Sequence, residues 1–82
     1  MISYGKQTID QGDIDAVVDV LKGDWLTQGA AVETFEDDLR KHFGAKHVCA
    51  VSSGTAALHL AALTLGWKPN DIVITSPLTF LA

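Results

Sequence analysis

The sequence predicts an α/β fold in which two helices precede a parallel strand–helix–strand unit. Apolar residues recur at helical spacing through the first half of the chain. Two short apolar runs in the second half have the length of buried strands, and they flank a segment rich in alanine and leucine. A connection of that length is what parallel strands need, and it is right-handed in the great majority of proteins.

The first helix is expected directly after Asp10, whose carboxylate suits an N-cap, with Asp13 as a second acid in the first turn. Four apolar residues then repeat at i, i+3, i+4 and i+7, the spacing of one buried helical face: Ile14, Val17, Val18 and Leu21. Gly23 is expected to end this helix in the left-handed conformation.

The second helix is expected from Ala31 to Phe43, after a loop at 24–29, and Gly44 should end it. Its apolar face would carry Val32, Phe35, Leu39 and Phe43. The charged residues on the other face are typical of a solvated surface. Two acid–base pairs on that face are spaced i, i+4 with the acid first, which is the better orientation: Glu36–Arg40 and Asp37–Lys41.

The second half of the chain has the pattern of a strand, a helix and a second strand. Because the helical segment is apolar nearly all round, it is expected to be buried. The expected elements are a buried strand at 48–51, a break at 52–55, a helix at 56–65 that Gly66 ends, a turn at 68–71 and a strand at 72–75.

Composition excludes several classes of protein. The 82 residues carry a net charge of −4, and their six basic residues form no run that would indicate nucleic-acid binding. No stretch reaches the ~18 apolar residues of a membrane helix, and the first residues lack the pattern of a secretory signal. The single cysteine forms no internal disulfide, so a cytoplasmic protein is expected. The uncovered apolar run at 72–82 predicts that the chain is part of a longer protein.

A candidate anion site lies at Ser52-Ser53-Gly54-Thr55, between the first expected strand and the helix after it. Ligands of open α/β sheets bind beyond the carboxyl ends of strands, and a helix N-terminus presents unpaired N–H groups. Gly54 would let a phosphate approach the backbone, and the hydroxyls of Ser53 and Thr55 could donate to it. The alternative is that Ser53 or Thr55 only caps the helix. The segment matches neither common nucleotide-phosphate loop, G-x-x-x-x-G-K-[ST] or G-x-G-x-x-G.

The run from Val48 to Ala61 resembles the cofactor-phosphate motif of the DegT/DnrJ/StrS aminotransferases. Three further segments are similar to that family in the same order: 23–29, 35–36 and 71–80. Tyr4, the loop at 25–29 and the run at 76–80 most resemble the members that aminate C4 of a UDP-linked 4-keto-6-deoxy sugar in pseudaminic-acid synthesis.

The resemblance implies the type I fold of pyridoxal-phosphate enzymes, with residues 1–82 an incomplete N-terminal part of the large cofactor-binding domain. Gly54 and Thr55 would donate to the phosphate of pyridoxal phosphate, supported by Ser53. Residues 1–30 would contact the substrate, and five of them would line the nucleotide-sugar site: Tyr4, Asp24, Trp25, Leu26 and Thr27. The complete protein would be a homodimer that takes its amino group from an amino acid, glutamate in most relatives.

The sequence also departs from the family pattern. Gly29-Ala30 stands where members often have Gly-Pro, and Ser53 stands where close relatives often have Asn. The lysine that holds the cofactor, the acid that pairs with its pyridinium nitrogen and the ring that stacks on it are all expected beyond Ala82. None of the five lysines matches the catalytic position. We therefore assign no catalytic residue and expect the 82 residues alone to be inactive.

The remaining candidate residues favour structural roles. His47 and His59 have no ligand partners at metal-site spacing, so no metal site is predicted. Cys49, in the middle of the first expected strand, is expected to be a small core residue, and Trp67 is expected to pack. Trp25 either packs against the uracil or sugar, or closes over the first helix.

Three alternative functions stay open. The first is a related pyridoxal-phosphate enzyme that dehydrates a keto sugar and has histidine in place of the lysine. The second is a non-catalytic α/β module that binds phosphate at Ser53-Gly54-Thr55. The third is a structural piece that folds only with another chain.

Overall fold

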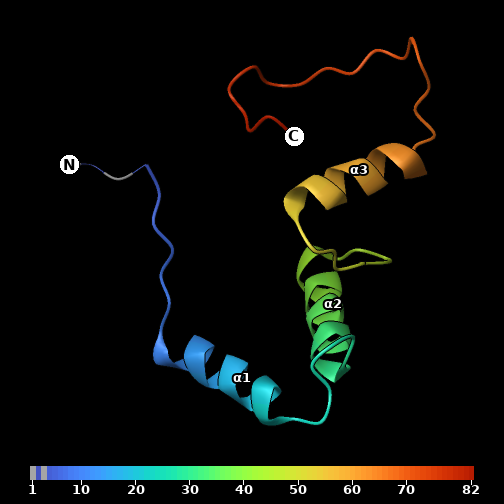
Figure 1. The fold of residues 1–82 in the computed structure, drawn as a ribbon. Helices are drawn as coiled ribbons and strands as arrows, with labels where there is room; N and C mark the ends of the chain where they lie inside the picture. Colours follow the sequence, from blue (N-terminus) through green and yellow to red (C-terminus); the bar gives the residue numbers. More distant parts are fainter. Residues whose placement is uncertain (1, 3) are drawn as a thin grey trace. The chain divides into compact units, whose positions relative to one another are not determined.

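Three helices joined by irregular segments make up residues 2 and 4–82, which are the residues that a computed structural model of the chain describes (Figure 1). The chain divides into two units, Met1–Val48 and Cys49–Ala82. Helices α1 and α2 belong to the first unit and α3 to the second.

Helix α1 spans Gln11–Lys22 and begins as the sequence predicts. Asp10 is its N-cap, and Asp10 and Asp13 form a reciprocal capping box that satisfies two backbone N–H groups. The predicted end is wrong in one respect, because Gly23 is extended (φ −77°, ψ 171°) and not left-handed. Its N–H donates to the carbonyl of Val20 at 3.1 Å, so a tight final turn closes the helix without a left-handed residue.

Helix α2 spans Ala30–Phe43, one residue earlier than expected. Gly44 ends it in the left-handed conformation (φ 62°), as predicted, and the N–H of Ala45 donates to the carbonyl of Arg40 at 3.0 Å. On the charged face Lys41 pairs with Asp37 as predicted, and Arg40 also binds Asp37. The proposed Glu36–Arg40 pair stays a prediction.

Helix α3 spans Gly54–Thr64 and begins two residues earlier than expected, because Ser53 caps it. The prediction that this helix is buried is wrong for the structure: Leu58 is 59% exposed and Leu63 is 63% exposed. A helix that is apolar all round needs packing partners on every side, and the rest of its unit is irregular backbone that supplies none. Gly66 ends the helix, as predicted, with φ of 69°.

The two expected strands, at 48–51 and 72–75, are not formed in the structure, so this part of the prediction is wrong. Within the described range the backbone bonds outside the helices are local turns and caps, and none joins these two segments. A strand exists only through hydrogen bonds to a neighbouring strand, so an apolar run without such a partner remains irregular. Cys49, expected in a strand core, is accordingly exposed.

No side chain among the described residues is buried, so the apolar faces that the sequence predicts are present but unpacked. On α1, Val17 is 60% exposed and Leu21 62%; on α2, Phe35 is 54% exposed and Phe43 72%. Caps and side-chain pairs within each helix are therefore the interactions that hold these elements. Among the same residues there is no helix long and apolar enough to cross a membrane.

Candidate functional site

The first turn of α3 is built around Ser53. Its backbone is extended (φ −162°, ψ 161°), and its Oγ accepts a hydrogen bond from the N–H of Ala56 at 3.1 Å. The carbonyl of Ser53 accepts from the N–H of Ala57 at 3.1 Å. These two bonds satisfy the third and fourth N–H groups of the helix start, and they confirm the interpretation of Ser53 as a cap.

The first two N–H groups of α3, those of Gly54 and Thr55, point along the axis away from the helix and have no intrahelical acceptor. A Cβ placed on Gly54 would meet no atom within 4 Å, so the space beside this backbone is open. The first turn carries no acidic side chain that would repel an anion. Capping by Ser53 and anion binding by Gly54 and Thr55 are therefore compatible, because they use different N–H groups.

These features fit a phosphate group. The partial positive charge of a helix N-terminus and two convergent N–H donors are the usual means of holding a phosphate without a basic side chain. The Thr55 hydroxyl adds a third possible donor. The positions that the sequence singles out for the cofactor are thus chemically suited to it.

The candidate substrate residues lie in the first unit, whereas Ser53, Gly54 and Thr55 lie in the second. The segment Asp24–Thr27 is part of the irregular connection between α1 and α2, as predicted, and we call it the substrate loop after the role predicted for it. Trp25 is 74% exposed and Leu26 is 64% exposed. Tyr4 is fully exposed, so its ring is open to contact.

Sequence reasoning missed the packing of Gly29 against Trp25. A Cβ on Gly29 would lie 3.0 Å from Trp25 Cβ and 3.2 Å from the Trp25 carbonyl oxygen. Gln28, between them, has a left-handed backbone (φ 50°) that turns the loop back on itself. A glycine at a helix N-cap position, where a capping side chain is usual, is the sequence signal that could have indicated this contact.

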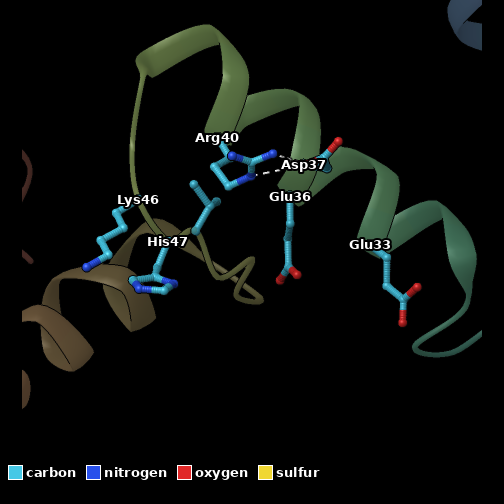
Figure 2. Close-up of a pocket in the computed structure, with 7 residues that line it drawn as sticks. Glu33, Glu36, Asp37, Arg40, Lys46 and His47 are labelled. Carbon is cyan, nitrogen blue, oxygen red and sulfur yellow. Dashed lines mark hydrogen bonds and ion pairs between the residues drawn. The ribbon is translucent and has the colours of Figure 1, made fainter.

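A shallow hollow of about 250 Å³ lies beside the charged face of α2 (Figure 2). Its lining comes from α2 and the segment after it: Glu33, Glu36, Asp37, Arg40, Lys46, His47 and Val48. Arg40 is turned to Asp37, with hydrogen bonds of 3.1 Å from Nε and 2.7 Å from Nη2. The hollow mixes acidic and basic groups on an open surface, which agrees with the predicted solvated face of this helix.

The remaining candidate residues are possible metal ligands and Cys49. No group of three His, Cys, Asp or Glu side chains that could hold a metal ion occurs among residues 2 and 4–82. Cys49 is exposed, which leaves its expected core role unsupported.

Comparison with known proteins decides the family. The model of the DegT/DnrJ/EryC1/StrS aminotransferase family matches residues 7–82. The chain belongs to this family. It is 51% identical, over all 82 residues, to the UDP-4-amino-4,6-dideoxy-N-acetyl-beta-L-altrosamine transaminase of Campylobacter jejuni subsp. jejuni serotype O:23/36 (strain 81-176), of which it covers 22%. This confirms the resemblance drawn from the sequence.

Other proteins match over nearly the same residues. The chain is 42% identical to the UDP-4-amino-4-deoxy-L-arabinose–oxoglutarate aminotransferase of Shewanella sediminis, with 94% of this chain and 20% of that protein covered. It is 44% identical to the spore coat polysaccharide biosynthesis protein SpsC of Bacillus subtilis, with 96% of this chain and 20% of SpsC covered. The chain thus spans about a fifth of the length of these relatives. No solved structure gives a significant match.

Proposed function

We propose that the chain forms the N-terminal part of a pyridoxal-phosphate-dependent nucleotide-sugar aminotransferase. The expected reaction moves an amino group from an amino acid, glutamate in the first instance, to C4 of a UDP-linked 4-keto-6-deoxy sugar in pseudaminic-acid synthesis. Support comes from the family and from the names of two Campylobacter jejuni relatives, both UDP-4-amino-4,6-dideoxy-N-acetyl-beta-L-altrosamine transaminases, at 51% and 48% identity. A cytoplasmic homodimer remains part of the proposal.

The observation that carries the proposal is the open start of α3. Gly54 and Thr55 present two N–H donors without intrahelical acceptors, beside free space and in a first turn that carries no acidic side chain. In the proposed enzyme these donors hold the cofactor phosphate, while Ser53 keeps the first turn of the helix in place. The bound cofactor would supply the site that accepts the amino group from the donor and passes it to the sugar.

The residues of the first unit would bind the other substrate. Trp25 and Leu26 offer exposed apolar surface, and the side chains of Asp24 and Thr27 offer polar groups for the sugar or its diphosphate. Tyr4 would add a ring and a hydroxyl donor. No proton-transfer role is assigned to any of these residues.

The direct test is a chimera in which residues 1–82 replace the matching segment of the Campylobacter jejuni transaminase that is 51% identical to this chain. We expect the chimera to produce 2-oxoglutarate from glutamate only when a UDP-linked 4-keto-6-deoxy sugar is present. A chimera that dimerises and binds pyridoxal phosphate but shows no turnover would contradict the proposed function. The 82 residues alone, assayed in parallel, should give no product.

Two alternatives are separated by reading the coding sequence beyond residue 82. A lysine at the cofactor position supports the aminotransferase, whereas a histidine there supports the keto-sugar dehydratase. If no catalytic domain is encoded, the hypothesis of a non-catalytic phosphate-binding module is favoured over both enzymes.

A further inference from the structure

We propose that Gly29 is a positioning residue for the substrate loop: its lack of a side chain allows the backbone of Trp25 to lie against it, which fixes where the indole is presented. The inference deepens the proposed function and rests on it for the role of the loop. The packing itself rests on the structure alone.

The contact between the two residues is too tight for a methyl group unless Trp25 moves by a few tenths of an ångström. A Cβ on Gly29 would approach Trp25 Cβ to 3.0 Å and the Trp25 carbonyl oxygen to 3.2 Å. Both distances are shorter than ordinary van der Waals contact. A rotamer change of the indole relieves neither, because one atom belongs to the backbone and the other is bonded directly to it. Any larger residue must therefore shift the Trp25 backbone.

Gly29 is anchored on its other side. Its carbonyl accepts a hydrogen bond from the N–H of Val32 at 3.0 Å, which ties it to the first turn of α2. The left-handed backbone of Gln28 makes the loop return to this point. A side chain at position 29 would consequently displace the loop, where no regular hydrogen bonds resist movement, before it displaces the helix.

The identity of the residue also argues for a role beyond capping. Gly29 makes no side-chain cap, although serine, aspartate or asparagine would cap α2 better. A glycine at this N-cap costs the helix little, and the close contact with Trp25 gives a physical reason for its presence. Trp25 remains 74% exposed, so its indole is free to stack on a flat ring. The uracil of a nucleotide sugar is such a ring.

The packing can be tested by nuclear magnetic resonance on the labelled 82-residue chain. We expect a nuclear Overhauser effect between Gly29 Hα and Trp25 Hβ. Gly29→Ala should weaken it and shift the amide signals of residues 24–27 and the Trp25 indole N–H, while the helical shifts of α2 persist. Gly5→Ala is the matched control, because a Cβ on Gly5 would meet no atom within 4 Å.

Two results would overturn the inference. One is the absence of the nuclear Overhauser effect between Gly29 and Trp25 in a chain whose α1 and α2 show helical chemical shifts. The other is a Gly29→Ala variant that either leaves the loop signals unchanged or loses the helical shifts of α2, since the latter would show a purely structural role.

A second arm separates this inference from the proposed function, with UDP-N-acetylglucosamine as the probe. We expect the probe to shift the Trp25 indole signal of the parent chain, and to shift it less in Gly29→Ala than in the parent chain. If the Gly29–Trp25 effect is present but the probe moves no loop signal, the substrate role fails while the packing stands. If the probe shifts the indole equally in the parent chain and in Gly29→Ala, the positioning role fails while the substrate role stands.

Discussion

Asp10 and Asp13 bind each other's backbone in both directions: the N–H of Asp13 donates to Asp10 Oδ1 at 3.0 Å, and the N–H of Asp10 donates to Asp13 Oδ2 at 3.0 Å. Since α1 has no buried side chain, this capping box is a main source of its stability. Asp10→Ala should destabilise α1 by about 1 kcal/mol. The Cα chemical shifts of residues 11–22 measure the loss.

The control for this prediction is Asp19→Asn, in the last turn of the same helix. A negative charge there opposes the helix dipole, so its removal should leave α1 unchanged or slightly more helical. Equal losses in the two variants would show that net charge, and not the cap, determines the helicity of α1.

The ion pairs of Asp37 make α2 sensitive to pH. The hydrogen bond from Lys41, which has the largest effect, and the one from Arg40 lower the pKa of Asp37 below its ordinary value of 3.8. This stabilisation is complete above pH 3.8 and is lost as the pH falls through the lowered pKa. The hydrogen bond to Asp37 raises the pKa of Lys41 above 10.5, so the contribution of Lys41 is complete below that pH and is lost as the pH rises through the raised pKa.

The helicity of α2 should therefore be highest between these two limits, as measured by the Cα shifts of residues 30–43 across a pH titration. In Asp37→Asn the dependence should flatten at both ends. Added salt should also flatten it in the parent chain, because both partners are exposed to solvent. An unchanged profile in Asp37→Asn would mean that other groups on the helix cause the pH dependence.

Ser53 offers a test of the α3 cap that is independent of any ligand. Ser53→Ala removes the acceptor for the Ala56 N–H and should destabilise α3 by about 1 kcal/mol. Ser53→Asn should preserve the helix, because asparagine is an equally good N-cap. The Cα shifts of residues 54–64 report the result, and a fully helical Ser53→Ala variant would contradict the role of the cap.

The helices could be predicted from the sequence because their causes are local. The i, i+3, i+4 repeat that follows Asp10 and the glycine after Phe43 each act within one or two turns, and the structure has both features. The sequence predicts the start of α3 two residues late because residues 52–55 have the composition of a break, although a serine before a helix is also a cap. The likeness to the aminotransferase family is visible in the run from Val48 to Ala61 and in three further segments, because a motif of neighbouring residues can be recognised without the fold.

The absence of the two expected strands and the presence of the loop contact could not be predicted in the same way, because both depend on distant or three-dimensional relationships. The run Ile72–Thr75 has the composition of a strand, but composition does not supply the neighbouring strand that makes a ladder. The packing of Gly29 on Trp25 depends on the left-handed turn at Gln28, an uncommon conformation for glutamine. Neither feature has a periodic signal in the sequence.

Gly54 allows a single N–H donor to be removed without disturbing the helix. It is the first residue of α3, a position where proline is well tolerated, and the extended backbone of Ser53 suits a residue before proline. Gly54→Pro deletes the N–H, whereas Gly54→Ala keeps it and places its methyl group in open space. Introduced into the chimera, the proline variant should bind pyridoxal phosphate more weakly by about 1.5–3 kcal/mol, the usual contribution of a hydrogen bond to a charged group.

That loss corresponds to about a ten- to hundredfold rise in the dissociation constant of the cofactor, while Gly54→Ala should stay close to the parent. Helical Cα shifts in α3 of the corresponding 82-residue variants verify that the proline has not unwound the first turn. Equal cofactor affinity in the proline and alanine variants would show that the Gly54 N–H does not contact the phosphate. The start of α3 would then be only a capped helix end, because the donor that distinguishes a phosphate site from a simple cap would have no effect on binding.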